Sequence, residues 1–502
     1  MSEKLFDVTI VGGGVGGLIC GAFLAKNGLK VLLLEKHSRV GGYCNSWERK
    51  GFRFDGGAEA ILGCGEGGYV RRILEGLGVV SDLNFNRILP FEHIITPDFE
   101  ISLTTFPEFK EGLLKIFPEE EKAIETYFKT VLKIQKAVIS VGTGVPSSFL
   151  SKLKFALKNL TAAKYYKKTF GELLDKCNIT KDKIKLRGLL TTHWAWLGTP
   201  PSRTWSYMAG IVYLDALMNG LWHVEGGIQK LPDALANSIQ KHGGVIRTKT
   251  GVEKILVEDG EAKGVKLEDG EKIQSKYVVS NADAKTTFLK LVEKEHLEKD
   301  FTRKIEEASQ SFSGFIAYLG VEMDIKWKYP FTALIREYDA EKTFEKIQKG
   351  ELVKDFIAIR IPSFIDPSYA PKGKHSVNIL TIQPYSYQNA WNTKKGKNEE
   401  YKKLKEKTTN QLIEEVENII PGLSDHIVVK DAATPITFAR YTGNSEGGWY
   451  GPLPDDKGFP ILSEETPIHN LFLAGHNASG GGVPSVIISG WRTATSILTK
   501  TG

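Results

Sequence analysis

The chain has 502 residues, of which 41% are hydrophobic and 25% charged, and its formal net charge is +6. This length is too great for one simple core, so we expect a globular α/β protein of two or three domains. The mild charge does not indicate a nucleic-acid partner, and no run of about 18 apolar residues is present that could span a membrane.

The start of the chain and its cysteines predict a cytoplasmic protein. Residues 1–4 lead straight into an apolar strand-like stretch, without the charged and then apolar regions of a signal peptide. Cys20, Cys44, Cys64 and Cys177 form no CxxC pair. This pattern favours free thiols over a disulfide framework or a zinc site.

The stretch over 7–35 has the pattern of a βαβ unit. A β-branched run over 7–11 predicts a buried strand, small apolar residues over 18–25 predict a helix packed on a sheet, and 30–34 predicts a second strand. Gly28 suits the end of the helix.

The glycines between the first strand and the helix stand in G-x-G-x-x-G order. Gly12 permits a tight turn, Gly14 lets the backbone approach a pyrophosphate, and Gly17 lets the helix lie close to the sheet. Free N–H groups at the helix start hold the negative charge. Glu35 lies roughly 20 residues further on, where an acid hydrogen-bonds the ribose hydroxyls. Strand, turn, helix and acid together predict a dinucleotide site.

Two further glycine motifs indicate which dinucleotide is bound. R-x-G-G over 39–42 follows Glu35, and D-G-G-A stands at 55–58. This ExxxRxGG…DxGG pattern resembles the FAD-dependent amine oxidase and phytoene desaturase superfamily. The resemblance implies that these glycines continue the backbone cradle under the FAD diphosphate and the flavin.

The middle of the chain contains two segments that each allow two interpretations. The basic amphipathic pattern over 147–169 predicts a helix that either lies on an anionic membrane surface or packs on the protein's own core with its lysines in solvent. The aromatic residues over 191–217 predict either core or the wall of a pocket for an elongated apolar ligand.

A later segment returns the chain to the nucleotide-binding part. The GG-x-x-x-L-P-x-A-L pattern over 226–235 resembles the desaturase family, in which it leads back into the FAD domain. In that family a residue at the Val252 position contacts adenine through its backbone. The strand over 277–280, which ends at Asn281, matches the family strand that closes the FAD half.

Residues 301–430 are expected to form a second insertion. The segments 312–321 and 356–361 predict strands of a substrate-domain sheet. The charged segment 393–418 predicts one solvated helix, to which we assign no function.

The C-terminal segment carries a second specific resemblance. The pattern TP…RYTGN…GGWYGP over 434–452 is similar to the carotenoid isomerase and retinol saturase branch. In the family, the following NLFLAG strand, glycine turn and helix bind FAD, with the helix start facing the flavin pyrimidine carbonyls. Many relatives have Gly-Asp after this strand, whereas this chain has Gly475-His476. The ribitol contact is therefore left open, and His476 is expected near the isoalloxazine ring.

The resemblance implies a discontinuous Rossmann-like FAD-binding domain of the GR2 type with an inserted α+β substrate domain. The FAD domain is predicted from 1–90, 220–300 and 431–502, and the substrate domain, with a mainly helical insertion, from 91–219 and 301–430. The predicted cofactor-binding residues are Gly12, Gly14, Val15, Gly16, Gly17, Glu35, Lys36, Arg39, Gly41, Gly42, Tyr43, Gly57, Ala58, Glu59, Val252, Asn281, Gly475, His476, Gly482, Val483 and Pro484.

The family acts mostly on long isoprenoids, which it desaturates, saturates at one double bond, or isomerises through reduced flavin. By residue type and motif position, the candidates for proton transfer are His476, Glu59, Glu446 and His193. The chain has no metal-ligand spacing and no second G-x-G-x-x-G fingerprint. NAD(P), if it is used, is therefore expected to visit the flavin transiently.

Three functions stay open. The first is an FAD enzyme acting on carbon–carbon bonds of an isoprenoid, a membrane-resident substrate that favours a peripheral membrane contact. The second is a flavin amine oxidase, with Trp449 and Tyr450 as an aromatic cage. The third is a prenyl-protein binding module of the Rab GDP-dissociation inhibitor type, without enzymatic activity. The intact glycines with Glu35 argue against the third function, and the pattern over 434–452 argues against the second.

Overall fold

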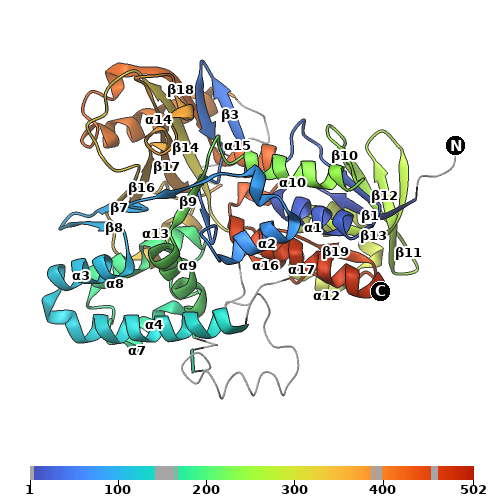
Figure 1. Cartoon of the computed structure of the whole chain (residues 1–502), viewed down its shortest axis with the longest axis horizontal. Coiled ribbons are helices and arrows are strands. Elements are labelled where there is room, and N and C mark those ends of the chain that lie inside the picture. The colour runs from blue at the N-terminus through green and yellow to red at the C-terminus, as the bar shows by residue number, and fades with distance from the viewer. Residues whose placement is uncertain are drawn as a thin grey trace.

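The computed structural model describes residues 5–141, 164–165, 168–385, 391, 398–453 and 462–501. Two large sheets lie at opposite ends of the molecule, with a layer of helices beneath the second sheet (Figure 1). Most of the basic segment predicted as a helix over 147–169 falls outside the described residues, so its membrane contact stays a prediction.

The first sheet assembles strands from three distant parts of the chain. Its order is β10-β2-β1-β13-β12-β11, and β19 also pairs with β13. The strands β10, β2, β1, β13 and β19 are parallel, whereas β11, β12 and β13 form an antiparallel meander. The bounds are β1 Phe6–Val11, β2 Val31–Leu34, β10 Val245–Arg247, β11 Val252–Glu258, β12 Glu261–Leu267, β13 Lys272–Ser280 and β19 Leu471–Leu473.

Successive side chains of β2 point to opposite faces of the sheet and are buried in two different cores. Val31 and Leu33 face helices on one side, while Leu32 and Leu34 face the meander and short helices on the other. The helices on the first side are α1 Val15–Lys26, α2 Tyr69–Leu77, α10 Lys230–Lys241 and α17 Val483–Thr501. The elements on the second side are α11 Ala284–Thr286, η4 Thr287–Leu291, η5 Lys294–His296 and α12 Lys299–Glu307.

The second sheet has the order β18-β14-β17-β16-β15-β7-β8. Its strands are β7 Glu92–Ile95, β8 Glu100–Leu103, β14 Ser313–Val321, β15 Phe331–Ile335, β16 Phe356–Arg360, β17 His375–Gln383 and β18 Ile427–Ala433. One face packs on α14 (Glu399–Glu417), which buries Leu412 and Val416. The predicted charged helix is thus present, but the expectation that it is solvated was wrong for one face, because that face covers the sheet.

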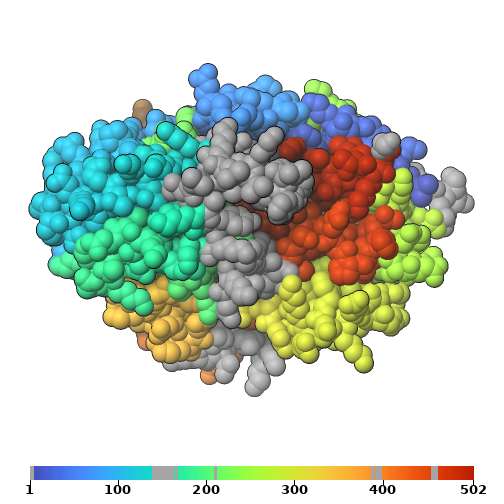
Figure 2. All heavy atoms as spheres, turned by 90° about the horizontal axis from the view of Figure 1, so that it is seen from below, coloured from blue at the N-terminus to red at the C-terminus, as the bar shows by residue number. Residues whose placement is uncertain are grey.

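The other face of the second sheet packs on the layer of helices. These are α3 Phe106–Ile116, α4 Glu121–Val141, α7 Phe170–Lys176, α8 Ile184–Thr191, η3 Thr192–Trp196, α9 Ser206–Asn219 and, at one edge, α13 Ala340–Gln348. Figure 2 shows this helical layer (cyan to green) and α17 (red) on opposite sides of one face of the molecule.

Smaller elements connect the two parts. Two small sheets contain β3 Ser46–Arg49 with β4 Phe52–Asp55, and β5 Ile61–Leu62 with β9 Leu221–Val224 and β6 Phe85–Ile88. The C-terminal connection contains α15 Pro435–Thr442, η10 Ser445–Gly447 and α16 His476–Ser479. The remaining short helices are η1 Val80–Asp82, η2 Pro118–Glu120, η6 Pro362–Phe364, η7 Pro367–Tyr369 and η9 Ser424–His426.

The predicted βαβ unit is confirmed in β1, α1 and β2. The domain boundaries stay a prediction, and β18 runs across the one expected between residues 430 and 431.

Gly17 is expected to be essential for the close packing of α1 on β1. A Cβ atom at this position would lie 2.5 Å from the carbonyl oxygen of Gly12, which is backbone and cannot turn away. We expect Gly17→Ala to lower the free energy of unfolding by about 1–3 kcal/mol, measured by denaturant titration.

Gly76→Ala in α2 is the matched control for Gly17→Ala. The atoms nearest to a Cβ at Gly76 belong to Phe23, at 3.8 Å, so the substitution fits and should stabilise the helix slightly. Equal effects of the two substitutions would contradict the packing role of Gly17.

Candidate active site

One cavity of about 2340 Å³ extends from the glycine turn after β1 to the second sheet and the helical layer. Every predicted cofactor-binding residue except Gly17 lines it. Gly17 is instead packed between Gly12 and Asn281, which is the structural position that its place in the motif predicted.

The carboxylate of Glu35 is fixed at one end of the cavity. Its Oε2 accepts a hydrogen bond from the Gly13 N–H at 2.8 Å, and its Oε1 accepts one from the His37 N–H at 2.8 Å. Glu35 is buried, and Lys36 and Val252 line the same cavity. The acid therefore holds the glycine turn in place and also faces the space where a ribose would lie.

Two helices begin at the same cavity. α1 begins at Val15, after the turn at Gly12 with φ +97°, and α17 begins at Val483, after Gly482 with φ +92°. A Cβ atom at Gly482 would have nothing within 4 Å, so the backbone here borders open space. Helix N-termini carry partial positive charge and free N–H groups. The start of α1 and the fixed acid therefore fit the predicted diphosphate and ribose, and the start of α17 fits the predicted pyrimidine carbonyls of the flavin.

Asn281 joins these pieces at the end of β13. Its Oδ1 accepts a hydrogen bond from the Gly17 N–H at 3.1 Å, and a Cβ on Gly14 would meet its Nδ2 at 2.7 Å. Gly16 packs equally closely, because its Cβ would lie 2.6 Å from Cα of Gly475. Asn281 therefore locks the helix start against the turn after β19.

The R-x-G-G and D-G-G-A turns continue the cradle. The Gly41 N–H donates to the Gly13 carbonyl at 2.8 Å, and the Ala58 N–H donates to the Tyr43 carbonyl at 3.1 Å. The Tyr43 hydroxyl lies 3.1 Å from the Gly447 carbonyl and 2.9 Å from the Gly448 carbonyl. These bonds connect the cradle to the loop before Trp449.

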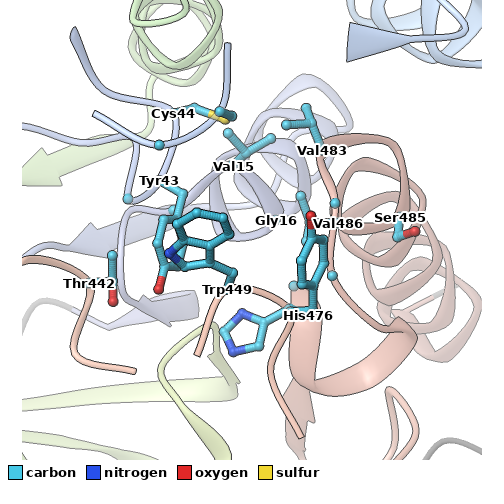
Figure 3. Close-up of a pocket in the computed structure, with 18 of the residues that line it drawn as sticks. Val15, Gly16, Tyr43, Cys44, Thr442, Trp449, His476, Val483, Ser485 and Val486 are labelled. Atoms are coloured by element: carbon cyan, nitrogen blue, oxygen red, sulfur yellow. The ribbon is translucent and has the colours of Figure 1, made fainter. Parts of the chain in front are cut away.

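His476 lines the cavity beside this loop, and its place near the isoalloxazine ring stays a prediction. Figure 3 shows its ring pointing toward Trp449, opposite Val15 and Gly16 of α1 and Val483 of α17. Burial lowers the pKa of His476, although the charge of Asp283 acts in the opposite sense. Within the described chain, its Nε2 has no hydrogen-bond partner. A neutral imidazole is thus available at the predicted flavin position.

The walls beyond the cradle are apolar. The second sheet contributes Phe331, Phe356, Ala358, Leu380 and Ile382. The aromatic segment over 191–217 provides both of its predicted environments, because Trp196, Trp205 and Tyr207 line the cavity whereas Trp194 and Tyr213 are buried in the core.

A pair of charged side chains, Glu59 and Arg360, interrupts these apolar walls. Glu59 and Arg360 both line the cavity, with Arg360 Nε 3.5 Å from Glu59 Oε2. The Asn378 amide donates to Glu59 Oε1 at 2.7 Å, and the Arg360 guanidinium donates to buried Glu92 at 2.9 Å. Burial raises the pKa of Glu59 to about 7, against the opposing effects of Arg360 and Asn378. Because burial outweighs these opposing effects, Glu59 can gain or lose a proton near neutral pH.

The expectation that His193 belongs to the reacting site is corrected by its position. His193 does not line the cavity; its Nε2 lies 3.1 Å from Glu92 Oε2, in the core behind Arg360. Its ring packs edge-on against Trp196, with a centroid distance of 4.2 Å. The sequence pattern, a histidine within an aromatic segment, does not indicate whether the side chain lies in the core or on the cavity wall. Glu446 does line the cavity, on η10, with φ +57°.

Sequence reasoning missed Arg360 and Asn378. Neither belongs to a motif, and the available signal was a single arginine at the end of an apolar strand. It also missed the role of Asp55 in the D-G-G-A turn. Asp55 is buried and accepts hydrogen bonds from the Tyr369 hydroxyl and the Ser46 hydroxyl, both at 2.6 Å. It therefore clamps the turn to the second half of the chain.

A dinucleotide cradle that opens into an apolar cavity defines the class of flavin-dependent oxidoreductases. The chain belongs to the flavin containing amine oxidoreductase family, whose model matches residues 15–498. The predicted fold class, a Rossmann-like FAD domain with an inserted substrate domain, is thereby confirmed.

Two curated relatives match almost the whole chain. Prolycopene isomerase 1, chloroplastic, from an Oncidium hybrid cultivar is 30% identical over 99% of this chain and 84% of its own length. All-trans-retinol 13,14-reductase from Danio rerio is 28% identical over 94% of this chain and 82% of its own.

Among solved structures, wild-type putrescine oxidase bound to putrescine is similar, with a TM-score of 0.64, 14% identity and 99% of both chains covered. This likeness concerns the fold alone. Among the described residues, no helix is both long enough and apolar enough to cross a bilayer.

Proposed function

We propose that this protein is an FAD-dependent oxidoreductase that acts on carbon–carbon bonds of a long apolar isoprenoid or polyene. The observation that carries the proposal is the continuity of the flavin cradle with apolar walls formed by Phe331, Phe356, Leu380 and Ile382. Such walls suit a hydrocarbon chain, because they offer contact area and few hydrogen-bonding groups. The names of the curated relatives, a prolycopene isomerase and a retinol reductase, support this substrate class.

The residues of the chain divide the work between holding the cofactor and handling the substrate. FAD, when bound, supplies hydride chemistry at its flavin ring. Glu35 would hold the ribose, the start of α1 would hold the diphosphate, and the start of α17 would face the flavin pyrimidine carbonyls. The apolar walls orient the polyene and exclude water. Glu59 would give or take the proton that accompanies hydride transfer, because its pKa near 7 allows both states.

Flavin amine oxidation is the less well supported alternative. Trp449 and Tyr450 line the cavity and could contribute to an aromatic cage. However, Arg360 stands beside Glu59 in the same wall, and its fixed positive charge disfavours an ammonium group there. The glycine turns and Glu35 likewise support FAD binding over a cofactor-free prenyl-protein module. We also propose that NAD(P) visits the flavin transiently as a redox partner. We further propose that the protein binds peripherally to a membrane.

The substrate class can be tested by direct comparison under identical conditions. Purified protein loaded with FAD, both as the oxidised form and after anaerobic reduction with dithionite, is incubated with a lycopene isomer or retinol in detergent. The oxidised form is incubated separately, in air, with putrescine or cyclohexylamine. We expect a new polyene product by chromatography and mass spectrometry, and no hydrogen peroxide from either amine. Amine oxidation without conversion of any polyene would overturn the proposal.

A further inference from the structure

A further acidic side chain, which belongs to none of the predicted motifs, lines the cavity. Asp215 lies on α9 and is 4% exposed. Its Oδ1 accepts a hydrogen bond from the Asn219 side chain at 2.6 Å. Its Oδ2 is buried and has no hydrogen-bond partner in the described part of the chain. A buried carboxylate oxygen without a partner is costly, so this group calls for a ligand.

The surroundings of Asp215 are largely apolar. Leu62, Tyr69, Leu221 and Trp222 line the same cavity, and the Trp222 indole N–H donates to the carbonyl of Asn219, the residue that binds Asp215. Burial raises the pKa of Asp215, and burial together with the Asp215 charge raises the pKa of Tyr69.

This end of the cavity is connected to the flavin cradle through a short strand. Ala60 and Leu62 line the cavity directly after Glu59, and Leu62 pairs with Leu221 across β5 and β9. An elongated ligand can therefore lie along apolar side chains, with one part near the cradle and one end near Asp215.

We propose that Asp215 binds a terminal hydroxyl group of the substrate, which makes the substrate a polyene or isoprenoid alcohol. The inference rests on the proposed function and names a chemical feature of its substrate. A hydroxyl group suits Asp215 in either protonation state, because it can both donate and accept a hydrogen bond. A carboxylate would be repelled. An ammonium group is the competing ligand for a carboxylate, and the titration of retinylamine described below distinguishes it from a hydroxyl group.

The test compares binding of an alcohol with binding of its methyl ether. All-trans-retinol and retinyl methyl ether are titrated anaerobically into the FAD-loaded protein, and the dissociation constants are read from quenching of tryptophan fluorescence. We expect the wild-type protein to bind the alcohol about tenfold more tightly than the ether, as one hydrogen bond would give. In Asp215→Leu this ratio should fall to about one while the ether still binds. In Asp215→Asn, which keeps an acceptor, most of the preference should remain.

The controls separate this inference from the proposed function. Asp300→Leu changes an exposed acid on α12 and should leave the preference for the alcohol unchanged. Equal binding of alcohol and ether by the wild-type protein would overturn the hydroxyl site alone. Tighter binding of retinylamine than of retinol, lost in Asp215→Asn, would overturn it in favour of an ammonium site. Failure of both alcohol and ether to bind would overturn the proposed substrate class as well.

Discussion

Glu35→Ala is expected to yield a folded protein that no longer retains FAD during purification. The substitution removes the carboxylate that accepts the Gly13 and His37 N–H groups, both at 2.8 Å, and that would also hold the ribose. Hydrogen bonds to a charged group each contribute about 1.5–3 kcal/mol, so we expect affinity for FAD to fall by about 100-fold or more. The measurement is the dissociation constant of added FAD, from quenching of flavin fluorescence.

Glu271→Ala is the matched control for Glu35→Ala. Glu271 is an exposed acid that pairs with Arg247 of the same sheet at 2.7 Å, outside the cavity. The Glu271→Ala protein should retain FAD like the wild-type protein. Undiminished FAD affinity in Glu35→Ala, with a native unfolding curve, would remove Glu35 from the cofactor site.

Glu59→Gln is expected to lower the turnover of polyene by about 10²–10⁴-fold while FAD stays bound. Glutamine keeps the shape of the side chain and can still accept the Asn378 amide, but it cannot exchange a proton. The measurement is product formation per bound flavin. Glu100→Gln is the control, because Glu100 is an exposed acid on β8 of the second sheet, to which Arg360 and Asn378 also belong.

The pH dependence of turnover shows whether Glu59 donates or accepts a proton in the reaction. Burial raises its pKa to about 7, so the side chain is mostly protonated below this pH and mostly ionised above it. If the enzyme saturates a double bond, Glu59 must donate, and activity should fall as pH rises through 7. If the enzyme desaturates, Glu59 must accept, and activity should fall as pH drops through the same value. If the activity of Glu59→Gln still changes near pH 7, the titrating group is a residue other than Glu59.

The cofactor cradle could be predicted because its determinants are local in sequence. The strand, the glycine turn, α1 and Glu35 lie within one short segment, and the conformations at Gly12 and Gly482 require positive φ angles that favour glycine. The likeness of the C-terminal segment to an isomerase and saturase branch also gave the relevant class of relatives, as the curated matches show.

The rest of the site depends on contacts between distant segments, which leave no periodic signal. Glu59 and Arg360 come from a loop and from β16, and only the fold brings them together. His193 and Trp196 lie on one short helix, yet one is in the core and the other on the cavity wall. The role of Asp215 could not be predicted from the sequence. A single acid in an apolar helix looks like an exposed acid until the structure shows that it is buried.

The most direct test of the account is the visible spectrum of the purified protein before and after anaerobic mixing with a polyene. We predict flavin absorption bands in the protein as purified or after addition of FAD. We further predict that the polyene bleaches these bands, or that the chemically reduced protein converts the polyene. A heavier product would then indicate saturation, and a product of equal mass would indicate isomerisation. A protein that takes up no FAD, or a flavoprotein that neither bleaches with nor alters any polyene, would contradict the account.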